Sequence, residues 1–320
     1  MKKKLLYLFY FLLTTLILLE VAVRIWGYSA HYVYDPIYAP FPASDEIPFV
    51  HKPNLVNGRA RGQAIINTDS LGLRSLVAGT EHGPKQPEEY RIAIMGDSVT
   101  FGEGVRQTAD TYPHLLQEQL NHISYKQVTV FNFGVSAYSV RTMAATLQHR
   151  ALAIEPDLVL MAVVPQDFDL TRTGVLDEWG YNVSQSARSS RLKYLLRQSH
   201  LVYLLRDMIV QWQTRAPLTP AVPWRPLPSY HYLQDFAALA QANNVAYAIV
   251  LLPMWRPDEF AALPAQVAAD DLVFVDLLAL ADDLSLDDYR ATQFDGHPSA
   301  LVHERIAAAL ADYVGEVMGE

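Results

Sequence analysis

Five short, almost wholly apolar runs alternate with segments of helical periodicity, and this alternation constrains the fold more than any other feature of the chain. The predicted strands are 90–95, 127–133, 157–164, 245–252 and 272–277, and the predicted helices are 112–123, 139–154, 230–243 and 300–318. Strands that are apolar on both faces and alternate with helices predict an α/β fold with one doubly wound, five-stranded parallel sheet.

The predicted domain runs from residue 90 to 320 and contains one unusually long connection. About eighty residues separate the third and fourth strands, including an amphipathic stretch at 190–212 and a proline-rich segment at 216–228. We expect a lid-like insertion at about 168–229, over the carboxyl ends of the strands, where open parallel sheets bind ligands. Residues 28–89 form a juxtamembrane and lead-in segment, and we expect its Tyr- and Pro-rich part, residues 28–53, to lie against this domain.

The first 27 residues have the pattern of a membrane span. Three lysines at 2–4 precede an apolar run, and a helix from Leu5 to Ile25 would extend about 30 Å, which is one hydrocarbon thickness. A cleaved signal peptide is the alternative, but Tyr28 stands where such a cleavage site needs a small side chain. We therefore predict a single-pass signal anchor with its N-terminus inside and the domain outside the cytoplasm.

Composition excludes several classes of function. The formal net charge of −9 provides no basic surface for a phosphate backbone, so nucleic acid is not an expected partner. The absence of cysteine excludes disulfides, thiolate nucleophiles and Cys-ligated metals. No His or carboxylate pair has the spacing of a zinc-protease site, so we expect neither a metal nor another cofactor. The oligomeric state is not readable from the sequence.

Two motifs far apart in the chain carry the predicted chemistry. Gly96-Asp97-Ser98 follows the first predicted strand, where Ser98 would be presented at the carboxyl edge of the sheet with its own N–H facing the crevice. Asp295-Gly296-His297 precedes the last predicted helix, on an expected loop. Asp295 can orient His297 through Nδ1 while Nε2 faces Ser98, which is the arrangement that a nucleophilic serine needs.

These blocks resemble the SGNH hydrolases, also called GDSL-type esterases, over residues 60 to 315. The segment 67–74 is similar to one found in membrane-anchored bacterial members. The resemblance implies a flavodoxin-like sheet and a catalytic triad of Ser98, His297 and Asp295. It also implies an oxyanion hole formed by the amides of Ser98 and Gly134 and by the side chain at position 166.

The chain departs from the pattern of that family in two places. Gln166 stands where the family has an asparagine, and its amide is carried one methylene further, by about 1.5 Å. Asp295 lies two residues before His297, where many members have three. The first departure matters more, because one lost oxyanion donor typically lowers turnover by about 100- to 1,000-fold.

Other candidate residues carry weaker signals. Trp255 and Arg256 follow the fourth predicted strand and could line a substrate pocket. Asp167 and Asp169 look like a carboxylate pair, with loop capping as the alternative. His303, in the last predicted helix, is expected to be a packed or surface residue.

Three functions fit these observations. The first is a serine hydrolase that cleaves esters through an acyl-enzyme, with O-acyl groups on an envelope or secreted glycan as substrate. The second is an O-acyltransferase that uses the same triad to pass the acyl group to a sugar hydroxyl. The third is a catalytically weak glycan-binding or assembly module, which the glutamine at position 166 keeps open.

Overall fold

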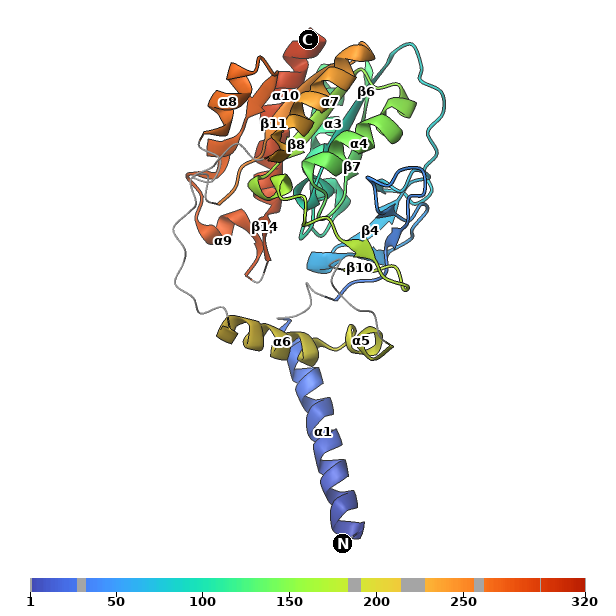
Figure 1. Cartoon of the computed structure of the whole chain (residues 1–320), viewed down its shortest axis with the longest axis vertical. Coiled ribbons are helices and arrows are strands. Elements are labelled where there is room, and N and C mark those ends of the chain that lie inside the picture. The colour runs from blue at the N-terminus through green and yellow to red at the C-terminus, as the bar shows by residue number, and fades with distance from the viewer. Residues whose placement is uncertain are drawn as a thin grey trace.

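Figure 1 shows the computed structural model of the chain, which describes residues 2–27, 33–183, 191–213, 228–255, 262–293 and 295–319. The predicted parallel sheet is confirmed. Its strands lie in the order β12-β11-β8-β6-β7, with all neighbours parallel. They are β6 (Glu89–Gly96), β7 (Gln127–Gly134), β8 (Leu158–Val163), β11 (Ala246–Leu251) and β12 (Phe274–Asp276). Numbered along the chain this order is 2-1-3-4-5, that of flavodoxin-like folds.

Helices cover both faces of the sheet because alternate side chains of each strand point to opposite faces. Ile92, Ile94, Leu158 and Leu160 pack with α3 (Tyr112–Ile123) and α10 (Ala300–Met318). Ala93, Met95, Val159 and Met161 pack with three helices on the other face. These are α4 (Val140–His149), α7 (His231–Ala242) and α8 (Leu263–Ala269).

The structure differs from the predicted helices at 139–154 and at 263–269, among other short elements. The helix expected at 139–154 ends at His149, and a separate 3-10 turn, Ala151–Ile154, follows because Arg150 has φ −136°. Helix α8 was not predicted, since its seven residues are too few to establish a helical period. Neither difference changes the sheet.

The described part of the lead-in segment, from residue 33 onward, packs against the domain. It forms the strand pair β1 (Tyr38–Ala39) and β2 (Val50–His51) and a three-stranded antiparallel sheet. The strands of that sheet are β3 (Gly58–Arg59), β4 (Ile65–Thr68) and β5 (Arg74–Ser75). Ile37, Phe49 and Ile66 are fully buried in the same core as the side chains of β6 and β8.

Arg74 ties this segment to the turn that follows Ser98. Its buried guanidinium donates to the carbonyls of Phe101 at 3.1 Å, Gly102 at 2.7 Å and Val105 at 2.8 Å. Backbone carbonyls at the end of a short helix have no partner within that helix, so these bonds satisfy them. The segment 67–74 therefore shapes the nucleophile's surroundings without contacting the serine.

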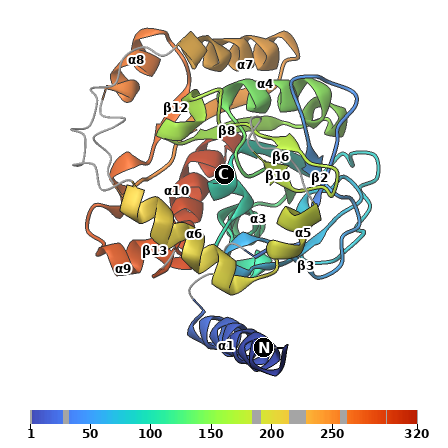
Figure 2. The ribbon, with the colours of Figure 1, turned by 60° about the horizontal axis from the view of Figure 1, so that its bottom comes forward.

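The long connection between β8 and β11 contains β9 (Val175–Leu176), β10 (Asn182–Val183), α5 (Arg191–Leu196) and α6 (His200–Gln213). Its proline-rich part lies outside the described residues except for Pro228. Helices α5 and α6 lie between the domain and α1 (Lys2–Trp26), which projects away from it (Figures 1 and 2). Among the described residues, α1 is the one helix long and apolar enough to cross a membrane.

We predict that Arg74→Met lowers the free energy of unfolding by about 2–4 kcal/mol, because three buried carbonyls lose a charged donor. Urea unfolding of the detergent-solubilised protein, followed by tryptophan fluorescence, measures the change. Arg141→Met is the control: Arg141 pairs with Glu46 at the surface and should change stability by less than about 1 kcal/mol. Equal effects of the two substitutions would contradict the role given to Arg74.

Candidate active site

Ser98 begins a four-residue helix immediately beyond the end of β6. This helix, α2 (Ser98–Phe101), is capped by Asp97, whose carboxylate accepts from the amide of Val99 at 2.8 Å. Gly96 permits the turn, because a Cβ there would lie 1.9 Å from Oγ1 of Thr100. The short helix therefore holds Ser98 at the carboxyl edge of the sheet.

The structure brings the three predicted triad residues together. Nε2 of His297 lies 2.9 Å from Oγ of Ser98, and Nδ1 of His297 lies 2.6 Å from Oδ1 of Asp295. The same carboxylate oxygen accepts from the backbone amide of His297 at 3.1 Å. Asp295 thus orients the imidazole through two bonds, and the two-residue spacing is compatible with this geometry.

The segment expected as a loop around His297 is a strand. β14 (Asp295–Pro298) pairs antiparallel with β13 (Arg290–Thr292), which holds the histidine against the sheet edge. Behind Asp295 the backbone of the lead-in segment approaches that of the nucleophile's loop. A Cβ on Gly62, whose φ is +71°, would lie 2.4 Å from Cα of Gly104 and 3.1 Å from Oδ2 of Asp295. Only glycine fits there.

Nearby acids control the charge of His297. Burial alone would lower the pKa of His297, but Glu103, Asp295 and Asp97 outweigh burial and raise it to about 9. Glu103 is itself buried and accepts a hydrogen bond from Oγ of Ser136 at 2.5 Å. Near neutral pH the imidazole of the resting protein is therefore largely protonated.

The two acids predicted as a pair separate in space. Asp167 is buried and accepts from the amide of Val164 at 2.8 Å, whereas Asp169 is exposed and accepts from Thr171. The partner of Asp167 is Asp97. Burial and the neighbouring Asp97 raise the pKa of the Asp167 carboxyl well above its ordinary range, and burial also raises the pKa of Asp97.

Gln166 lines the cavity in front of Ser98, and its orientation is defined. Its Oε1 accepts from Nη1 of Arg172 at 2.7 Å. Because a guanidinium can only donate, the amide atom that faces Arg172 must be the oxygen. The other amide atom of Gln166 is therefore Nε2, a hydrogen-bond donor. Among the described residues, neither Nε2 of Gln166 nor the amide of Ser98 has a hydrogen-bond partner.

The structure does not support the role predicted for Gly134. Its amide donates to Oδ1 of Asn132 at 2.9 Å, and the residue does not line the cavity. Its position requires glycine for another reason, since a Cβ there would lie 2.4 Å from the amide nitrogen of Phe101. Gly134 thus allows α2 to approach β7 closely. The resemblance implied an oxyanion-hole role for this residue, but in the structure its role is in packing.

The cavity at the triad has a volume of about 370 Å³. Val99, Val164 and Met254 provide apolar lining, and Arg61, Glu103 and Gln166 provide polar lining. Trp255 is not among the lining residues: its ring packs on Tyr289, with centroids 5.8 Å apart. Arg256 lies outside the described residues.

Sequence reasoning missed Arg61, Glu103 and Met254. Arg61 comes from the lead-in segment and lies 4.0 Å from Glu103, over the ring of Tyr34. No sequence pattern links it to Ser98. Glu103 follows the serine motif closely and could have been considered on that ground. His303, by contrast, was expected to be either a packed or a surface residue, and it is packed. It is fully buried, and its Nδ1 accepts from the amide of Tyr112 at 3.0 Å.

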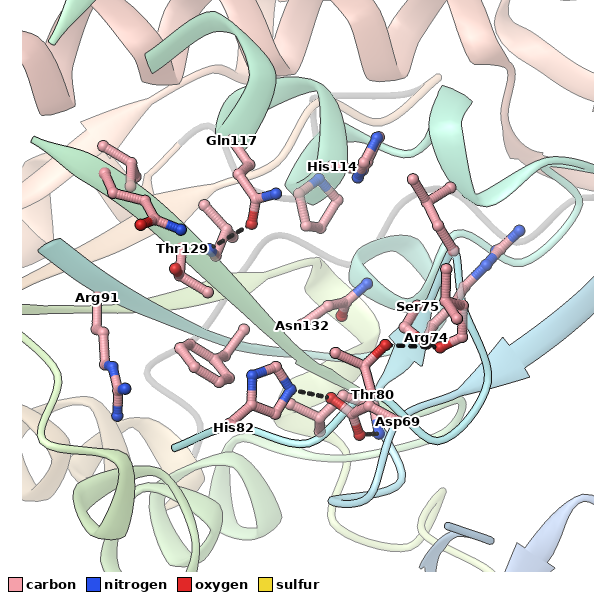
Figure 3. A pocket seen from close by; sticks show the side chains of 18 of the residues that line it. Asp69, Arg74, Ser75, Thr80, His82, Arg91, His114, Gln117, Thr129 and Asn132 are labelled. Atoms are coloured by element: carbon pink, nitrogen blue, oxygen red, sulfur yellow. Dashed lines mark hydrogen bonds and ion pairs between the residues drawn. The ribbon is translucent and has the colours of Figure 1, made fainter. Parts of the chain in front are cut away.

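A larger cavity, of about 650 Å³, lies elsewhere and shares no lining residue with the first (Figure 3). It runs beside the edge strand β7, whose Val130 amide donates to Gln117. Within it His82 is paired with Asp69 at 2.8 Å, and Asn132 is bonded to Thr100 and Gly134. Its polar side chains thus support the surrounding backbone, and the chemistry belongs to the smaller cavity.

Several solved structures are similar to this chain. They include the psychrotrophic esterase EstA from Pseudoalteromonas sp., with 15% identity over 72% of this chain and 99% of that one and a TM-score of 0.45. The lipase/acylhydrolase from Enterococcus faecalis shares 13% identity over 71% and 96%, with a TM-score of 0.43. A GDSL-like lipase from Bacteroides thetaiotaomicron shares 15% over 74% and 93%, also at 0.43. No curated protein matches the chain.

The assignment rests on a family match and not on these distant likenesses. The GDSL-like Lipase/Acylhydrolase family matches residues 94–305, which is about two thirds of the chain and includes Ser98 and His297. The chain therefore belongs to the GDSL-like lipase/acylhydrolase family and is an ester-cleaving hydrolase of the SGNH type.

Proposed function

We propose that this hydrolase is a membrane-anchored enzyme that removes short O-acyl groups from an envelope or secreted glycan, with Ser98 as nucleophile. The observation that carries the proposal is the continuous hydrogen-bonded line from Ser98 through His297 to Asp295 beside an open cavity. Nucleophile, base and orienting carboxylate are all within bonding distance, as acyl transfer through a serine requires.

In the proposed reaction, Oγ of Ser98 attacks the ester carbonyl while Nε2 of His297 takes the hydroxyl proton. The negative charge that develops on the carbonyl oxygen is stabilised by the amide of Ser98 and by Nε2 of Gln166. His297 then returns its proton to the leaving alkoxide, and the acyl group stays on Ser98 until water removes it by the same steps in reverse.

Arg172 supports the role of Gln166 as a donor. By holding the amide oxygen, it prevents the rotation that would point that oxygen at the developing negative charge. Although glutamine is one methylene longer than asparagine, its side chain is not free to move, because Arg172 holds the amide oxygen. Arg172 is a positioning residue in this scheme.

The substrate class is inferred from the cavity and from the predicted location. A cavity of about 370 Å³ that is partly lined by apolar residues suits a short acyl group. Arg61, Glu103 and Gln166 present hydrogen-bonding groups, which suit hydroxyl-rich sugars. An anchor at residues 1–27 with the lysines inside would place this cavity on the side of the membrane where envelope glycans are found.

Ser98→Ala should reduce hydrolysis of p-nitrophenyl acetate by at least about 1,000-fold, because the nucleophile is removed without disturbing the core. His297→Ala should behave in the same way, and circular dichroism checks that both variants fold. Retention of near-parental turnover by either variant would show that the triad is assigned wrongly.

Gln166→Ala should lower kcat by about 100-fold with little change in KM, since the donated bond forms mainly in the transition state. Gln166→Asn should also lower kcat, because the shorter side chain cannot bond both Arg172 and the oxyanion. Arg172→Ala should reduce kcat in the parent but cause no further loss in the Gln166→Ala background. Equal rates for the Ala, Asn and parental forms would remove Gln166 from the site.

The pH profile follows from the charge on His297. Since the pKa of His297 is raised to about 9 and only the neutral imidazole accepts a proton, kcat/KM should rise with pH up to about 9. Glu103→Gln removes a charge that favours the imidazolium, so the rising limb should move to lower pH. Glu118→Gln, on the exposed surface of α3, is the control and should leave the profile unchanged. If the rise of kcat/KM occurs at the same pH in Glu103→Gln as in the parent, the role given to Glu103 is wrong.

A further inference from the structure

Helix α6 is fixed to the membrane-side helix α1 by one carboxylate. Glu20 of α1 accepts from the amides of His200 and Leu201 at 3.0 and 2.9 Å and from Oγ of Ser199 at 2.8 Å. Arg24, one turn further along α1, donates to Glu20 at 2.8 Å and to the carbonyl of Gln198 at 3.0 Å. The start of α6 is thus bonded directly to the end of the candidate span.

The other side of the α5–α6 segment is tied to the domain by polar and aromatic contacts. Arg59 donates to Gln198 at 3.0 Å, Arg197 pairs with Asp177 at 3.0 Å, and Tyr194 stacks on Trp179 with centroids 5.1 Å apart. These contacts hold α5 and the turn before α6 against the domain. The segment is therefore held from both sides, by the domain and by α1.

Both helices carry exposed apolar side chains. They include Leu192 (65%), Leu195 (70%), Leu205 (49%), Met208 (58%) and Ile209 (55%). At about 100° per residue, Leu205 and Met208 lie about 140–200° around the axis from Tyr203, which is partly buried and interacts electrostatically with Tyr34 of the domain. One side of α6 thus faces the protein, and an apolar stripe faces away from it.

The bonds to α1 indicate what covers this stripe. Glu20 and Arg24, which hold the start of α6, lie within the last two turns of the predicted span from Leu5 to Ile25. Helix α6 would therefore begin at the level where that span reaches the membrane surface. Helices that lie in the membrane interface bury their apolar face about 5–10 Å into the headgroup and acyl boundary. A leaflet at this level would receive the stripe of α6.

We infer that α5 and α6 form an interfacial membrane element, whose apolar face inserts into the leaflet at which α1 ends. The partner is the lipid surface itself. This inference rests on the proposed anchor, because α6 is positioned by Glu20. β14, which carries His297, lies on the side of the domain that faces α6 (Figure 1), so the insertion would turn the cavity toward the membrane surface.

The absence of cysteine in the chain permits a direct test by single-cysteine labelling. Leu205→Cys and Met208→Cys in the full-length protein are labelled with the fluorophore NBD and reconstituted into phosphatidylcholine–phosphatidylglycerol vesicles with or without doxyl-labelled lipid. We expect blue-shifted emission and loss of at least about half of the fluorescence to the doxyl lipid at both positions. Thermal unfolding of each labelled variant checks that it is folded.

Two further positions make the result decisive. Arg206→Cys is the matched control, exposed on the same helix but only about 60° from Tyr203, and should be quenched by aqueous iodide and not by doxyl lipid. Leu12→Cys reports on α1 and should be quenched by doxyl lipid. If doxyl lipid quenches the label at Leu12 while iodide quenches the labels at Leu205 and Met208, the proposed anchor is supported and the inference fails.

The remaining outcomes also overturn the inference. Protection of Leu205 and Met208 from both quenchers would show that protein, and not lipid, covers the stripe. Iodide quenching at Leu12 would show that α1 does not span the bilayer, and the proposed anchor and the inference would then fail together. Doxyl quenching at Leu12, Leu205 and Met208, with iodide quenching at Arg206, is the one result that supports it.

Discussion

The structure depends on β6 being hydrogen-bonded along both of its edges. β6 pairs with β7 over its full length, with Gly96 opposite Gly134, and with β8 from Ile92 onward. Its side chains from Tyr90 to Met95 are also buried on both faces. A strand held in four directions cannot shift at its end, so the serine two residues beyond it has a fixed position. The rigidity of the site is thus a property of the sheet.

The charges around this serine are distributed unevenly. Asp97, Asp167 and Glu103 are buried beside or behind it, whereas Arg172 lies on the exposed side. Burial and the neighbouring Asp97 raise the pKa of the Asp167 carboxyl, which limits the negative charge behind the reacting carbonyl. Glu103, Asp295 and Asp97 favour the imidazolium form of His297. The arrangement thus stabilises the charge that the histidine carries after it takes the proton of the serine.

The sheet and the triad were predictable because both follow from local patterns. Uninterrupted apolar runs indicate buried parallel strands, and a serine or histidine placed just beyond such an element lies at the edge where ligands bind. Arg61 could not be predicted, because it reaches the cavity through tertiary packing of the lead-in segment. The error at Gly134 has a related cause: a glycine in a motif does not show whether its amide is free, and here Asn132 accepts from it. Asp167 and Asp169, two residues apart in sequence, have opposite surroundings for the same reason.

The close approach of Gly62 to Gly104, with Asp295 beside both, has a consequence for biosynthesis. Asp295 follows Gly62 by about 230 residues and Gly104 by about 190, so the carboxylate that orients the histidine is synthesised long after both glycines. The nascent chain would carry Ser98 on a complete strand while lacking its base, which follows 199 residues later. The enzyme would remain inert until β14 emerges and joins segments that have already folded.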